Sequence, residues 1–258
     1  MSARSPFGSF LFDPLRGWLD QLQARPDSAA LADLAERFPV HADNGQRIRF
    51  VPPQADGRIY ECRIHECGEV ETRPDNWHDF FNALVWLNFP RTKNAISAAH
   101  VRAMQAPGEQ RGGVRDALTH FDECGIAVLS PRADLLELLQ GFRWKELFVE
   151  HREDLRRSMR FVVFGHATYE QLLAPFRGLT AKALLYRVEA SWLEMSAGDL
   201  SAAVDRLLAA DVEAGRITRP RDLQPLPLLG IPGLVPASED PAYYDDTWQF
   251  RPGRSRQG

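Results

Sequence analysis

The chain has 258 residues, 44% of them hydrophobic and 26% charged, with a formal net charge of −4 and a pI near 6.0. These values are typical of globular proteins and give no global positive field to attract nucleic acid or an anionic membrane. No segment approaches the roughly 20 apolar residues that span a bilayer, so we expect no membrane partner. The first dozen residues lack a secretory pattern, and the three cysteines fit neither a disulfide framework nor a paired zinc motif. We therefore expect a cytoplasmic protein.

The first quarter of the chain predicts two helices and then two strands. Residues 14–25 carry apolar side chains at helical spacing, and a second helix, capped by Asp27 or Ser28, ends before Pro39. Strands are predicted over 47–51 and 58–67, because a turn with prolines and a glycine separates them and the second run alternates apolar with charged residues.

In the middle of the chain, helices alternate with short buried strands. A helix that is apolar on nearly all sides follows Asp75, its expected N-cap, and extends to residue 89. One helix passes through Gly125 into a strand over 126–129, and a strand over 160–164 turns at Gly165 into a further helix. Helices are also predicted over 135–139 and 200–214, whereas 181–188 fits either a strand or a helix.

The last forty or so residues differ from the rest in composition. From Pro220 onwards, prolines and glycines are expected to exclude regular structure, yet the leucines and isoleucines between them are too apolar for a free tail. The sequence thus predicts an α+β fold: a helix-rich single domain around a small mixed sheet, with a Pro-rich C-terminal strap. Residues 14–219 would form its core, and residues 220–258 the strap and a loose tail.

The apolar helix after Asp75 carries a line of polar residues. His78 and Asn82 are four residues apart and Asp79 lies between them, so they share one side of the helix. A buried polar group without a hydrogen bond costs about 1–3 kcal/mol, so something polar must face them. A satisfied packing network and a functional site both meet this requirement. The position of Asp79 in the first helical turn is also explained by the helix dipole alone.

Two strand–helix junctions supply further candidates. On a helix, Asp116, His120 and Glu123 share one face, and Asp122 with Glu123 precedes Gly125, where side chains often reach a cleft. His166 begins a helix directly after a buried strand, a position that commonly lines a site. The candidate catalytic residues are His78, Asn82, Asp122, Glu123 and His166, and the candidate ligands of a divalent metal are Asp122, Glu123 and His166. The other interpretations are solvated helix ends, a core histidine, and a His166–Glu170 pair.

Positive groups are present that could balance these acids, namely Lys93, His100 and Lys182, although each is more often an ordinary surface residue. A second basic group, formed by Arg152, Arg156, Arg157 and Arg160, suggests a nucleic-acid surface, but a solvated face explains it better. The chain has no Gly-x-Gly-x-x-Gly, phosphate loop, Gly-x-Ser-x-Gly or His-Glu-x-x-His motif, so no nucleotide cofactor is expected.

Several segments together resemble one family. They are Trp77-His78-Asp79-Phe80-Phe81-Asn82, Phe89-Pro90-Arg91-Thr92-Lys93, Leu118-Thr119-His120-Phe121-Asp122-Glu123, Phe164-Gly165-His166-Ala167, and the ending Pro225-Leu226-Pro227-Leu228-Leu229-Gly230-Ile231-Pro232-Gly233 with Tyr244-Asp245-Asp246. The chain resembles the bacterial family known as domain of unknown function 3025 over most of its length. In that family the position of His120 is usually apolar, which favours Asp122 and Glu123 over His120 as ligands. The resemblance implies no activity.

Three hypotheses follow. The first is an enzyme with a His/Asn/Asp/Glu cleft, with or without a divalent metal, for hydrolytic or acid/base chemistry. The second is a non-catalytic binding or scaffold protein in which the same residues form a buried polar network. The third is a nucleic-acid-binding protein that uses residues 152–160, which the net charge makes the least favoured.

Overall fold

The structure, a computed structural model, describes residues 7–23, 26–105 and 110–253. Its first elements are a 3₁₀ turn, η1 (Phe10–Leu15), and two helices, α1 (Arg16–Gln21) and α2 (Ser28–Arg37). Asp27 caps α2 by accepting hydrogen bonds from the backbone of Ala29 and Ala30, as the sequence predicts. Residues 24–25, the end of the first predicted helix, lie outside the described residues.

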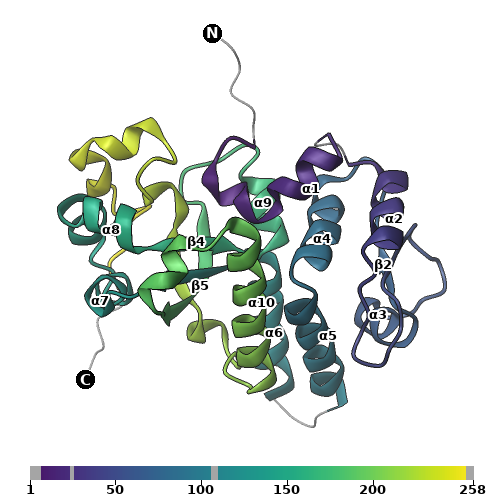
Figure 1. The fold of residues 1–258 in the computed structure, drawn as a ribbon. Helices are drawn as coiled ribbons and strands as arrows, with labels where there is room; N and C mark the ends of the chain where they lie inside the picture. Colours follow the sequence, from purple (N-terminus) through teal and green to yellow (C-terminus); the bar gives the residue numbers. More distant parts are fainter. Residues whose placement is uncertain (1–6, 24–25, 106–109, 254–258) are drawn as a thin grey trace.

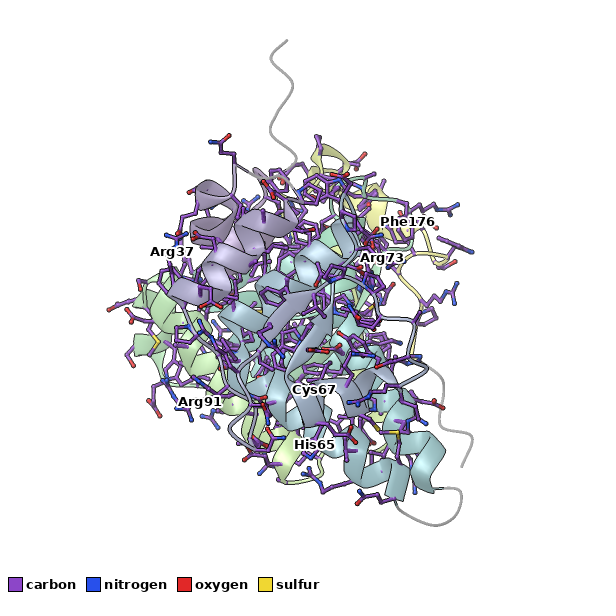
Figure 2. The ribbon with its side chains drawn as sticks, turned by 90° about the vertical axis from the view of Figure 1, so that its right-hand side faces the viewer. Arg37, His65, Cys67, Arg73, Arg91 and Phe176 are labelled. Atoms are coloured by element: carbon purple, nitrogen blue, oxygen red, sulfur yellow. The ribbon has the colours of Figure 1, made fainter. Side chains whose placement is uncertain are left out.

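A small two-stranded parallel sheet follows, and it corrects one prediction. Strand β1 (Arg49–Val51) pairs with β2 (Glu69–Glu71), and residues 58–67, predicted as a strand, form the connecting helix α3 (Tyr60–Cys67). The buried Arg63 of α3 is held by Glu69 at 2.9 Å and Glu71 at 3.1 Å, which are tertiary ion pairs that local alternation cannot reveal. Figure 2 shows His65 and Cys67 at the end of this helix.

Gly68 explains why α3 ends where it does. Its φ of +68° lies in the left-handed region, and a Cβ there would stand 2.2 Å from the carbonyl oxygen of Arg47. A glycine therefore allows the chain to turn from α3 directly into β2. The smaller hydrophobic cluster of the molecule lies in this region and consists of Ala42, Ile48, Ile64, Val70 and Trp86.

Three long helices come next: α4 (Trp77–Asn88), α5 (Pro90–Gln105) and α6 (Gln110–Cys124). The N-cap of α4 is Asn76 rather than the expected Asp75, since the Asn76 side chain accepts from the backbone N–H of Asp79 and Asp75 adopts a φ of +53°. The first turn of α5 is capped by a residue of another helix, because Asp205 accepts hydrogen bonds from the backbone N–H groups of Arg91 and Thr92.

The larger sheet has the order β4-β3-β5-β6. Its strands are β3 (Gly125–Ser130), β4 (Arg160–Val163), β5 (Thr180–Arg187) and β6 (Gln224–Pro227), and only the β3–β5 pair is parallel. The sheet is mixed, as predicted, and residues 181–187 of the ambiguous segment 181–188 belong to strand β5. Between these strands lie α7 (Ala133–Gln140), the π-helical turn η2 (Glu146–Glu150), α8 (Arg152–Ser158), α9 (His166–Gln171), η3 (Ala190–Glu194) and α10 (Ala197–Glu213).

The C-terminal segment is only partly the irregular strap that the sequence predicts. It contains β6 between η4 (Pro220–Asp222) and the short turns η5 (Leu228–Gly230), η6 (Pro236–Glu239) and η7 (Pro241–Asp245). Pro225 and Pro227 occupy an edge strand, where a missing N–H on the outer side breaks no ladder hydrogen bond. Tyr244 fastens the segment to the body, because its hydroxyl donates to the carbonyl of Gly230 at 2.8 Å and its ring packs on Phe148 and Phe250.

The elements surround one main hydrophobic cluster. Helix α5 contacts both α6 and α10, and α6 contacts β5, while α7 packs against β3 and β5. Figure 1 shows α10, α6 and α5 next to the larger sheet with α4 above α5, and the C-terminal segment near α7 and α8. Among the helices of the described residues, none is both long and apolar enough to cross a bilayer. The three cysteines are free thiols.

Candidate metal centre

Two glycines bring the strand–helix junctions together. β3 and β4 are antiparallel, so the residue before β3 and the residue after β4 meet at the same end of the sheet. The N–H groups of Phe164 and Gly165 both donate to the carbonyl of Gly125, at 2.9 and 2.8 Å. A Cβ on Gly165 would lie 2.4 Å from the backbone of Gly125 and 2.5 Å from that of Glu123, so only glycine permits this approach. The end of α6 and the start of α9 are therefore neighbours.

Helix α4 supplies a third side chain at the same place. It packs against α9, and His78 in its first turn faces the start of α9. His78 Nε2 lies 3.1 Å from His166 Nε2, with the two rings edge to face at 75°. A carboxylate oxygen of Glu123 lies 3.6 Å from His166 Nε2 and 3.9 Å from His78 Nε2. These three residues form a group whose ligand atoms all lie within 4.8 Å of one another.

An acidic residue stands behind each ring. His78 Nδ1 lies 3.1 Å from Glu170 Oε2, and His166 Nδ1 lies 3.7 Å from Asp122 Oδ2. Burial lowers the pKa of His166 to about 3, so its ring is neutral and carries a single N–H. Glu170 is placed to accept from Nδ1 of His78, which leaves an electron lone pair on His78 Nε2. Nδ1 of His166 is buried without a hydrogen-bond partner among the described residues, and the charge of Asp122 at 3.7 Å favours the N–H there.

The resulting arrangement is electrostatically incomplete. With the N–H of both rings on Nδ1, two Nε2 lone pairs and the Glu123 carboxylate face one point, and none of these acceptors has a donor to offer the others. A direct hydrogen bond from His166 Nε2 to His78 would move the His166 proton away from Asp122 and set a lone pair against a carboxylate. A cation between the three groups removes this conflict, and acidic partners on the far nitrogens are characteristic of histidines that bind metals.

A second polar cluster adjoins the first and is fully paired. Lys93 is 4% exposed, and its Nζ donates to both carboxylate oxygens of Asp122 at 2.7 and 2.8 Å and to Asn82 Oδ1 at 2.9 Å. Asn82 in turn donates to the hydroxyl of Tyr60 at 3.0 Å, and the Trp86 ring lies 5.3 Å from Nζ. Burial pushes the pKa of Asp122 up, but the ammonium of Lys93 outweighs it and holds that pKa below its ordinary value.

The sequence-predicted site residues divide between these clusters. The structure brings His78, Glu123 and His166 into one group, and it places Asp122 and Asn82 beside that group, bonded to Lys93. Asp79 instead accepts from the backbone and guanidinium of Arg73, whose side chain lies at the surface in Figure 2. His120 is exposed and lies outside the group.

Four residues near the site were not assigned to it from the sequence. Glu170 partners His78, although its spacing suggested His166. Tyr60 and Glu61 lie on α3, which the sequence predicted as a strand, so no helical spacing pointed to them. Burial raises the pKa of Glu61 to about 7, and the negative charge of Asp122 raises it as well, whereas Lys93 opposes the shift. Lys93 was recognised only as one of several positive groups.

The predicted basic group on residues 152–160 is partly neutralised. Arg152 forms an ion pair with Glu239 at 2.8 Å, and Arg156 pairs with Glu153 and with Glu239. Arg160 donates to two backbone carbonyls. Two of the four arginines are thus held by the C-terminal segment rather than presented to a polyanion.

Comparison with known sequences gives a family and no function. The model of the family described as "Protein of unknown function (DUF3025)" matches residues 48–254. The matched range includes both polar clusters. The searches of curated proteins and of solved structures gave no match.

Proposed function

The chain belongs to the DUF3025 family, and from its site geometry we propose that it is a zinc-dependent hydrolase whose metal ion is held by His78, Glu123 and His166. The observation that carries the proposal is the convergence of two imidazole lone pairs and a carboxylate on one point. Two histidines with one carboxylate form a known ligand set for catalytic zinc.

The spacing of the three ligand atoms supports zinc. Ligands about 2.1 Å from a tetrahedral ion are about 3.4 Å from one another. The distances of 3.1, 3.6 and 3.9 Å between His78 Nε2, His166 Nε2 and the Glu123 oxygen bracket that value. Small rotations of the half-exposed Glu123 side chain are enough to equalise them.

The exposure of the ligands supports a catalytic rather than a structural role. Structural zinc sites are closed by four protein ligands, whereas catalytic sites keep one position for water. His166 is 5% exposed, but the side chains of His78 and Glu123 are 32% and 37% exposed. The site is therefore buried on the side of His166 and open to water and substrate on the side of His78 and Glu123.

The chemistry divides between the ion and the chain. When bound, zinc lowers the pKa of a water ligand to about 7 and polarises a carbonyl or phosphoryl oxygen. By accepting from Nδ1 of His78, Glu170 keeps His78 Nε2 available, and the charge of Asp122 favours the same tautomer of His166. Lys93 balances the charge of Asp122 and fixes its position. Hydrolysis needs no further cofactor.

The paired cluster favours a second candidate, a non-catalytic protein. Lys93, Asp122, Asn82 and Tyr60 join α3, α4, α5 and α6 through short hydrogen bonds, as a packing network would. This function explains the Lys93 cluster but leaves the lone pairs of His78 and His166 unexplained. The two candidates differ in whether the protein binds a metal ion.

Metal content tests the proposal. Tag-free protein, its Glu123→Gln variant and an Asp116→Asn control are analysed for bound metal, Asp116 being an exposed carboxylate on the same helix. We expect about one zinc per chain in the wild type and the control and a strong loss in Glu123→Gln. Zinc-loaded protein should then hydrolyse a generic ester or phosphodiester that zinc-free protein leaves intact. Equal metal content in all three proteins, or none in a folded wild type titrated with zinc, would refute the proposal.

A further inference from the structure

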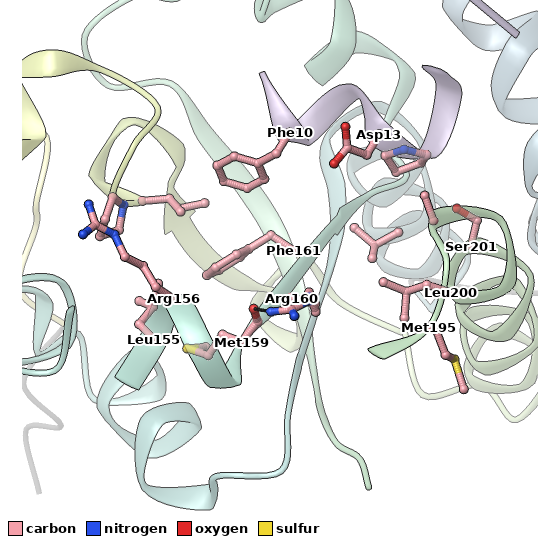
Figure 3. A pocket seen from close by; sticks show the side chains of 15 residues that line it. Phe10, Asp13, Leu155, Arg156, Met159, Arg160, Phe161, Met195, Leu200 and Ser201 are labelled. Carbon is pink, nitrogen blue, oxygen red and sulfur yellow. Dashed lines mark hydrogen bonds between the residues drawn. The ribbon is translucent and has the colours of Figure 1, made fainter. Parts of the chain in front are cut away.

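A hollow of about 450 Å³ lies between η1, β4 and α10, apart from the residues of the metal centre. Its apolar walls include the rings of Phe10 and Phe161, which face each other in Figure 3. Leu155, Met159 and Leu200 complete the walls and are nearly or fully buried. The volume lies within the range of sites that bind small organic molecules, and such sites are mostly apolar with a few polar groups.

Two of the three charged groups that line this hollow already have partners of opposite charge. Asp13 accepts from the guanidinium of Arg16 at 2.7 and 3.0 Å. Arg156 pairs with Glu153 and Glu239 at 2.9 and 3.2 Å. These residues therefore add little net charge to the hollow.

Arg160 is the exception. It is half-buried, and its guanidinium donates to the carbonyl oxygens of Met159 at 2.9 Å and Leu193 at 2.8 Å. Within the described ranges, no carboxylate lies at ion-pair distance from it. Two of its five N–H donors are thus occupied by neutral groups, and its charge is not compensated. A half-buried guanidinium beside apolar walls is an anchor for an anion, above all a planar carboxylate.

We propose that this hollow binds a small amphipathic carboxylate, with the carboxylate on Arg160 and the apolar tail between the rings of Phe10 and Phe161. The positive charge of Arg160 favours an anionic head group, and the apolar lining favours an apolar tail. Met159 and Met195 are flexible side chains that adapt to tails of different shape. The inference is independent of the metal centre, since no lining residue belongs to it.

Calorimetric titration of zinc-free protein with three straight-chain probes of eight carbons tests the proposal. Octanoate, octan-1-ol and octylamine carry an anionic, a neutral and a cationic head group, so we expect octanoate to bind at least about tenfold more tightly than octylamine, with octan-1-ol between them. Equal affinity for the acid and the amine would refute the role of Arg160. Absence of octanoate binding at millimolar concentration would refute the site.

Variants locate the binding. Ala197 is exposed on α10 at the edge of the hollow, so Ala197→Trp should fill it and abolish octanoate binding, whereas Ala202→Trp, exposed on the same helix outside the lining, should not. Arg160→Gln should lower octanoate affinity about tenfold and leave octan-1-ol affinity unchanged, with the exposed Arg157→Gln as the control. Unchanged octanoate affinity in both Ala197→Trp and Arg160→Gln would place the ligand elsewhere. Saturation with zinc should alter none of these affinities, which separates this site from the proposed hydrolase.

Discussion

Two polar clusters lie side by side in this protein, and they differ in how their polar groups are paired. In the Lys93 cluster, every group faces a partner of opposite character, and the contacts between Lys93, Asp122 and Asn82 measure 2.7–2.9 Å. In the His78 cluster, two imidazole nitrogens and a carboxylate face one another at 3.1–3.9 Å. The first cluster is complete as the chain folds it, and the second is the one for which we propose a cation.

The difference teaches how to separate a structural network from a binding site. Residue types alone do not separate the two, because polar and charged side chains, carboxylates among them, occur in both clusters. Asp122 connects the two clusters, since it accepts from Lys93 and faces His166 Nδ1. If the distinction is correct, the Lys93 cluster contributes to folding stability and the His78 cluster contributes to metal affinity.

The largest effect is expected from Lys93→Met. The substitution leaves Asp122 in its buried place without a counter-charge, which typically costs about 3–5 kcal/mol. Glu123→Gln in zinc-free protein should change the free energy of unfolding by less than about 1 kcal/mol, because Glu123 is half-exposed and faces other acceptors. Urea unfolding in the presence of a chelator measures both. A similar loss in the two variants would remove the distinction between the clusters.

A pH effect of about 3 kcal/mol is expected from His100, which lies near Lys93 and Asp122. Burial lowers the pKa of His100 from 6.5 to about 4, an effect that Asp122 opposes and that Arg115 and Lys93 strengthen. Below pH 6.5 the unfolded chain binds this proton and the folded protein does not, so stability is lost as the pH falls from 6.5 towards 4. His100→Asn should flatten this part of the profile of unfolding free energy against pH. A variant profile with the same slope would show that His100 is protonated in the folded protein.

A smaller effect is expected from Glu170→Gln, which keeps a hydrogen-bond acceptor for His78 Nδ1 but removes its charge. Loss of such a partner typically lowers metal affinity about 10–100-fold, or about 1–3 kcal/mol. Competition with a chromophoric chelator measures the zinc affinity, and Glu137→Gln, an exposed residue on α7, serves as control. If zinc affinity is unchanged while folding stability falls, Glu170 belongs with the structural network instead.

Much of the secondary structure is predictable because it depends on local signals. Asp27 caps α2, the glycines at 125 and 165 mark strand–helix junctions, and α4 is apolar on nearly all sides. The wrong predictions concern segments where tertiary contacts override local pattern. Arg63 of the helix over residues 60–67 pairs with Glu69 and Glu71 of the following strand, and the edge of a sheet accommodates Pro225 and Pro227.

The site shows the same division between what local sequence signals predict and what tertiary contacts determine. By itself the sequence determined which residues are unusual: His78 and Asn82 on an apolar helix, Asp122 and Glu123 before one glycine, and His166 after another. Only the tertiary structure decided how they are grouped. The antiparallel register of β3 and β4 brings Glu123 to His166, and the packing of α4 on α9 adds His78, while Lys93 draws Asp122 and Asn82 to the other side. Local pattern fixes which face of an element a side chain occupies, whereas its partner depends on contacts between segments far apart in the chain.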